Sequence, residues 1–119
     1  MAENIILEKT FRFSLMIIEF CEELQSNRKY VIADQLLRSG TSIGANIREA
    51  QNSESNSDFI HKFKIAAKEA DETEYWLLLC QASKSYPFNS KLLCELIDIK
   101  KIITKIISTS NKHKIVNRS

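Results

Sequence analysis

The sequence predicts an all-α fold, an antiparallel up-and-down four-helix bundle. Its 119 residues are the size of one domain. The chain contains only two glycines and one proline, whereas a many-stranded protein needs turn residues about every 8–12 positions. Apolar residues instead recur at spacings of three and four, the period of an amphipathic helix. Long helices with short polar connections therefore account for the pattern.

The first predicted helix spans about residues 4–24 and carries two adjacent apolar sets. One set consists of Leu7, Phe11, Leu15, Ile18 and Cys21. The other consists of Phe13, Ile17, Phe20 and Leu24. A helix that is apolar over so wide an arc is expected to be covered by more than one neighbour.

The second predicted helix spans about 30–51 and is expected to be continuous in spite of Gly40 and Gly44. Each glycine costs about 1 kcal/mol relative to alanine in a helix, but the apolar spacing persists across both. We expect these small residues to let another helix approach closely. In a hairpin with the third helix, Gly40 would lie near Ala70, and Ser42 near Ala66 and Ala67.

The third predicted helix spans about 57–83, with Ser57 as its N-cap and Asp58 in its first turn. The same hairpin would bring Arg38 of the second helix towards Glu69 or Glu72. Pro87 is expected to end this helix before the next one begins.

The fourth predicted helix spans about 90–109, with Ser90 as its cap and a broad apolar stripe from Leu92 to Ile107. Residues 1–110 would form the bundle. Residues 111–119 would form a basic, flexible tail.

The residue pattern predicts no enzyme, metal site, cofactor or small-molecule substrate. His61 and His113 are the only histidines, and neither follows a glutamate by three positions, as a di-iron bundle requires. The three cysteines are expected to be reduced core thiols. No signal peptide and no membrane span of about 20 apolar residues is evident, so a cytoplasmic location without membrane contact is expected.

One face of the second helix carries four polar residues at helical spacing: Arg38, Ser42, Asn46 and Glu49. Polar groups on a partly buried face require partners. Hydrogen bonds between helices, which would fix register or oligomer contacts, are the favoured interpretation. A ligand or RNA contact remains the alternative.

Charge is unevenly distributed along the chain. Residues 1–99 hold 11 Lys/Arg against 15 Asp/Glu, a net of −4. Residues 100–119 hold no acid and six cations: Lys100, Lys101, Lys105, Lys112, Lys114 and Arg118. Such a segment could contact phosphates, although a solvated helix face followed by a charged tail has the same composition. The stretch lacks aromatic residues, which argues against stacking on unpaired bases.

The segment Arg38 to Ala50, with Ser42-Ile43, Asn46-Ile47 and Glu49, resembles a known family. These are bacterial four-helix-bundle proteins first noticed as reading frames within intervening sequences of 23S ribosomal RNA. Their pattern is Arg, then Ser-Ile-x-x-Asn-Ile-x-Glu-Gly, followed by a helix that opens with Phe-Ile, as in Phe59-Ile60 here. The resemblance covers about residues 7–107. Ala50 replaces the usual glycine, and Gly44 stands where proline is common.

The resemblance implies a bundle that assembles as a ring-like homopentamer. A relative that accompanies diversity-generating retroelements is a partner of nucleic acid and reverse transcriptase, and catalysis is not attributed to the family. The favoured hypothesis is therefore a non-enzymatic homo-oligomer that binds RNA or a nucleoprotein. Arg38 and Arg48 would be secondary contacts. The rival hypothesis is a protein-interaction scaffold or accessory subunit without nucleic-acid contact.

Overall fold

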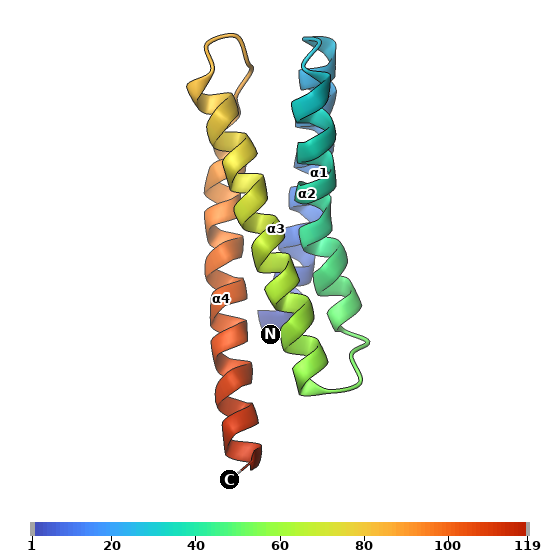
Figure 1. Cartoon of the computed structure of the whole chain (residues 1–119), viewed down its shortest axis with the longest axis vertical. Coiled ribbons are helices and arrows are strands. Elements are labelled where there is room, and N and C mark those ends of the chain that lie inside the picture. The colour runs from blue at the N-terminus through green and yellow to red at the C-terminus, as the bar shows by residue number, and fades with distance from the viewer. Residues whose placement is uncertain (1, 119) are drawn as a thin grey trace.

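The chain folds into four antiparallel helices that run up and down the bundle in sequence order (Figure 1). The computed structural model describes residues 2–118, with side chains described for 5–112. The helices are α1 (Ala2–Ser26), α2 (Tyr30–Ala50), α3 (Asn56–Ala82) and α4 (Ser90–Arg118). Each helix packs against its two neighbours in a closed ring, with α4 returning to α1. Within the described residues, no helix carries an apolar stretch long enough to cross a membrane.

The face of α1 that enters the core is the second of the two predicted sets. Phe13, Ile17, Phe20 and Leu24 are buried, as is Cys21. From the first set, Phe11, Leu15 and Ile18 are instead 56%, 48% and 40% exposed. The wide apolar arc of α1 is therefore only half covered within one chain.

Helix α2 is continuous through both glycines, as predicted, but the helix that approaches them is α1 and not α3. A Cβ added at Gly40 would lie 2.9 Å from the Cγ1 and Cγ2 atoms of Ile17. A Cβ at Gly44 would lie 3.2 Å from the hydroxyl of Thr10. The prediction named α3 as the helix that these small residues admit, whereas the atoms nearest to both glycines belong to α1.

The α2–α3 interface contains a buried polar contact. Ser39 and Thr73 are fully buried, and their hydroxyl oxygens lie 3.0 Å apart in a hydrogen bond. Both residues occupy core positions of otherwise apolar faces. Because unpaired buried hydroxyls would be costly, this pair favours one register of α2 against α3.

Two helix caps differ from the prediction, by two residues at α3 and by one residue at α4. Ser55, not Ser57, caps α3: its backbone is extended and its hydroxyl accepts the N–H of Asp58 at 3.0 Å. Before α4, the Asn89 side chain accepts the N–H of Lys91 at 3.1 Å, which makes Asn89 the cap in place of Ser90. The competing residues are similarly good caps, so backbone geometry decides between them.

Helix α4 continues to Arg118, beyond its predicted end at about 109, so residues 111–118 are helical. No glycine or proline follows Pro87 to stop the helix. The Asn56 side chain donates to the Ser110 carbonyl at 3.1 Å and joins the start of α3 to α4. Beyond this contact, α4 runs past the α2–α3 connection, as Figure 1 shows at the C-terminal end.

We expect Gly40→Ala to destabilise the fold by about 1–3 kcal/mol, because the clash with Ile17 outweighs the gain of about 1 kcal/mol in helix propensity. Urea denaturation of both proteins measures the difference. In an Ile17→Ala background the same change should be neutral or stabilising, because the clashing atoms are gone. An equal cost in both backgrounds would contradict this account of Gly40.

Candidate nucleic-acid interface

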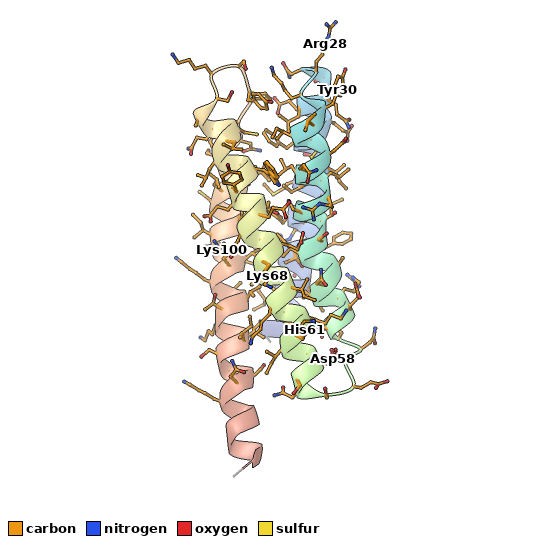
Figure 2. All side chains as sticks on the ribbon, in the orientation of Figure 1. Arg28, Tyr30, Asp58, His61, Lys68 and Lys100 are labelled. Carbon is orange, nitrogen blue, oxygen red and sulfur yellow. The ribbon has the colours of Figure 1, made fainter. Side chains whose placement is uncertain are left out.

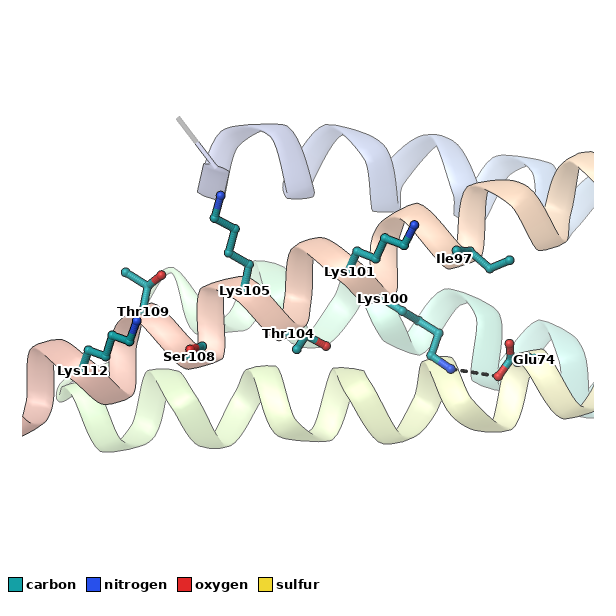
Figure 3. Close-up of a pocket in the computed structure, with 9 residues that line it drawn as sticks. All are labelled: Glu74, Ile97, Lys100, Lys101, Thr104, Lys105, Ser108, Thr109 and Lys112. Atoms are coloured by element: carbon teal, nitrogen blue, oxygen red, sulfur yellow. Dashed lines mark hydrogen bonds and ion pairs between the residues drawn. The ribbon is translucent and has the colours of Figure 1, made fainter.

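A shallow groove of about 700 Å³ runs along α4, and Glu74 of α3 lies at one end of it. Its lining includes four lysines and three hydroxyl residues, namely Lys100, Lys101, Lys105, Lys112, Thr104, Ser108 and Thr109 (Figure 3). Glu74 and Ile97 complete one end. We refer to this feature as the basic groove. Four of its nine lining residues are lysines, which gives the groove a positive charge suited to an anionic ligand.

Lys100 is held in place by α3. Its Nζ atom lies 2.8 Å from a carboxylate oxygen of Glu74 and 2.9 Å from one of Asp71. The hydrogen bond that Lys100 donates to Glu74 raises the pKa of Lys100, against an opposing effect of burial, and Asp71 raises it further. Of the six predicted cations, Lys100 therefore has its charge compensated within the chain.

Lys101, Lys105 and Lys112 are exposed and form no ion pair with any described residue. Their spacing of four and seven residues places them along one side of α4, over roughly 16 Å of helix axis. Figure 3 shows Lys101 and Lys105 pointing away from α3, while Lys100 reaches towards Glu74. The side chains of Lys114 and Arg118, also predicted as contacts, lie outside the described residues.

Sequence reasoning missed the hydroxyl residues of the basic groove. Thr104 and Ser108 follow Lys101 and Lys105 by three residues each, and Thr109 follows Lys105 by four. That spacing places hydroxyls beside the cations. A search for charge and aromatic residues alone does not find them.

The polar face predicted on α2 is made of two kinds of contact. Arg38 forms ion pairs with both Glu69 and Glu72, as the hairpin predicted, and Glu49 pairs with Lys62 at 3.2 Å. These contacts join α2 to α3. Ser42 and Asn46 instead donate to backbone carbonyls one turn earlier in α2. Their hydrogen bonds therefore do not cross to another helix.

Side chains that could support catalysis are not brought together among the described residues. His61 is exposed on α3 (Figure 2). Burial, with a smaller contribution from Cys80, raises the pKa of the Cys21 thiol to about 11. Burial also raises the pKa of Cys80, so both buried thiols are protonated and unreactive at neutral pH. No group of His, Cys, Asp or Glu in the described part of the chain could hold a metal ion.

Comparison with known proteins identifies relatives over nearly the whole chain. The family described as 23S rRNA-intervening sequence protein matches residues 2–107. A crystal structure of a protein of unknown function from the S23 ribosomal protein family of Bacteroides thetaiotaomicron is 40% identical and has a TM-score of 0.86. The match covers 91% of this chain and 99% of that one. No curated protein matches the chain.

We expect Lys100→Met to destabilise the protein by about 1–2 kcal/mol, because it leaves the Asp71 and Glu74 carboxylates without their cation. The neighbouring Lys101→Met, which breaks no ion pair, should change stability by less than about 0.5 kcal/mol. Urea denaturation at neutral pH measures both.

The pH dependence gives the same test a second readout. Because the folded-state pKa of Lys100 is raised above 10.5, its contribution is fully present below that pH and is lost as pH rises through the folded value. The gap between wild type and Lys100→Met should therefore be constant at neutral pH and close in strong alkali. A gap that grows with rising pH would contradict this role.

Proposed function

Because the chain belongs to the 23S rRNA-intervening sequence protein family, we propose that it is a non-enzymatic oligomeric protein that binds RNA through the basic groove. The observation that carries this proposal is the row of uncompensated cations Lys101, Lys105 and Lys112 on one side of α4. Each cation that neutralises a phosphate releases a counterion, which makes affinity strongly dependent on salt. The Arg38 side chain is already paired with α3, so it is not among the proposed contacts.

Two exposed apolar surfaces support self-association. The first, on α1 and α2, consists of Phe11, Leu15, Ile18 and Leu37. The second, on α3 and α4, consists of Tyr75, Leu78 and Ile97. The helices form a closed ring, so these surfaces lie on opposite sides of the bundle. Contact between two different surfaces is heterologous, and it generates a closed ring when the rotation between copies is suitable.

The pentamer implied by the sequence resemblance would be such a ring. In it, the α1/α2 surface of each copy would cover the α3/α4 surface of the next, including the Ile97 end of the basic groove, and would leave the stretch from Lys101 to Lys112 open. Five basic grooves on one particle would bind one polyanion far more tightly than a single groove does. Self-association and RNA binding therefore belong to one proposal.

Replacing Lys101, Lys105 and Lys112 together by glutamine should weaken RNA binding by at least about tenfold at moderate salt and flatten the dependence of affinity on salt. Fluorescence anisotropy with a labelled RNA at two salt concentrations measures both effects. The matched control replaces Lys64, Lys68 and Lys84 by glutamine. These lysines are exposed and make no ion pair with any described residue.

The control removes the same charge from other parts of the surface, so equal loss in both variants would show that only net charge matters. Failure of the wild type to bind RNA even at low salt would reject the RNA proposal. The exposed apolar surfaces would then favour the scaffold hypothesis, with protein partners to be sought.

We expect light scattering to give a mass of about five times the 13.7 kDa chain, and Leu15→Glu to reduce it to that of the monomer. A charge at the centre of the α1/α2 surface would be buried without a partner in the ring. Glu19→Gln, on an exposed part of α1 outside this surface, is the control and should leave the mass unchanged. A monomeric wild type would reject the ring.

A further inference from the structure

We infer that the basic groove is built for double-stranded RNA, with lysines on the phosphates and hydroxyl side chains on the ribose 2′-hydroxyls. This inference rests on the proposed function and specifies its ligand. The relevant residues are Lys101, Lys105 and Lys112 for the phosphates, and Thr104, Ser108 and Thr109 for the sugar.

The hydroxyls of the basic groove differ from those elsewhere in the bundle. In α1 to α3, five serines and threonines donate to the backbone carbonyl four residues earlier: Thr10, Ser14, Thr41, Ser42 and Thr73. Thr104, Ser108 and Thr109 are exposed and make no hydrogen bond with any described residue. Both the donor and the acceptors of each hydroxyl therefore face solvent.

The arrangement of these side chains matches the features that A-form RNA presents. The minor groove of an RNA duplex is wide and shallow and displays 2′-hydroxyls between two phosphate backbones. On α4, hydroxyl residues lie beside and between the lysines over roughly 16 Å of a rigid helix. A rigid row of cations fits best on phosphates that are themselves held at fixed positions, as in a duplex.

The side chains of the basic groove disfavour two other nucleic acids. Proteins that bind single strands use aromatic side chains on which bases stack, and the lining of the basic groove contains none. DNA offers the same phosphate charges but lacks the 2′-hydroxyl, which distinguishes RNA from DNA at a given site. The lysines contact a phosphate charge that both duplexes share, and the hydroxyls are the groups of the basic groove that can recognise the 2′-hydroxyl directly.

Access to the basic groove also suits a ligand as large as a duplex. The contact between Asn56 and Ser110 marks the level at which α3 begins beside α4. From there, α4 extends to Arg118 past the α2–α3 connection (Figure 1). Lys112 therefore lies just beyond the end of the α2–α3 hairpin, at the open end of the basic groove.

The test compares three labelled ligands of one sequence of about 20 nucleotides: duplex RNA, duplex DNA and a single RNA strand without self-complementarity. Fluorescence anisotropy at fixed moderate salt gives the three affinities for the full chain. We expect duplex RNA to bind about tenfold more tightly than duplex DNA, as a few added hydrogen bonds provide. The single strand should bind more weakly than duplex RNA.

The decisive variant carries Thr104→Val, Ser108→Ala and Thr109→Val. It should lower the affinity for duplex RNA to that for duplex DNA and leave the affinity for duplex DNA unchanged. The unchanged DNA affinity also shows that the variant is folded, and circular dichroism provides a separate check. A control with Thr41→Val and Ser42→Ala, whose hydroxyls are bound to their own backbone, should keep the wild-type preference.

The outcomes separate this inference from the proposed function. Equal affinity for duplex RNA and duplex DNA, tighter binding of the single strand, or a preference that survives the hydroxyl variant would overturn the inference. RNA binding through the lysines would stand in each of those cases. Absence of binding to all three ligands at low salt would reject both.

Discussion

The close packing of α1 against α2 depends on Gly40, which has no side chain. At Gly40 the place that a Cβ would take is occupied by Ile17, so the two helices can pack only with this face of α1 turned inward. Phe11, Leu15 and Ile18 are then rotated towards solvent. The other flank of α2 is left facing α3, where Ser39 meets Thr73 in the core. The orientation of three helices therefore depends on one close contact.

The second half of the bundle combines a buried apolar stripe on α4 with one ion-pair cluster to α3. The buried apolar stripe of α4, from Leu92 to Ile106, sets how α4 is rotated, and Lys100 beside it binds Asp71 and Glu74 of α3. With Lys100 turned inward, Lys101 and Lys105 necessarily point outward, because successive residues are about 100° apart on a helix. Adjacent lysines thus have different roles: one stabilises the bundle, and the next is available to a partner.

Periodicity was sufficient to predict the four helices, the continuity of α2 and the pairing of Arg38 with α3. It could not decide which apolar arc of α1 is buried, because both arcs have the same spacing and only the packed neighbours distinguish them. Periodicity also could not decide whether Ser55 or Ser57 caps α3, because both are good caps and lie in one polar stretch. At the other end of the chain, polar composition was taken to end α4, although polar residues without glycine or proline do not stop a helix.

For the basic groove, charge in the sequence identified the lysines but could not tell the compensated Lys100 from the uncompensated Lys101. That distinction depends on Asp71 and Glu74, more than twenty residues away in the sequence. The same three and four spacing that predicted the helix could have identified the hydroxyls beside the lysines. They are neutral residues, however, and their availability is evident only once their backbone contacts are known.

The continuation of α4 past the other helices has a kinetic consequence. Residues 1–99 carry a net charge of −4 and residues 100–119 carry +6, and the long helix converts this separation along the sequence into a separation in space. The molecule is therefore an electric dipole whose positive pole lies towards the C-terminal end of α4. Near any polyanion, the field turns that end forward before contact, and the acidic body is repelled. A larger fraction of collisions then occurs in the productive orientation. The association rate constant therefore rises at low ionic strength, although the contacts of the final complex are unchanged.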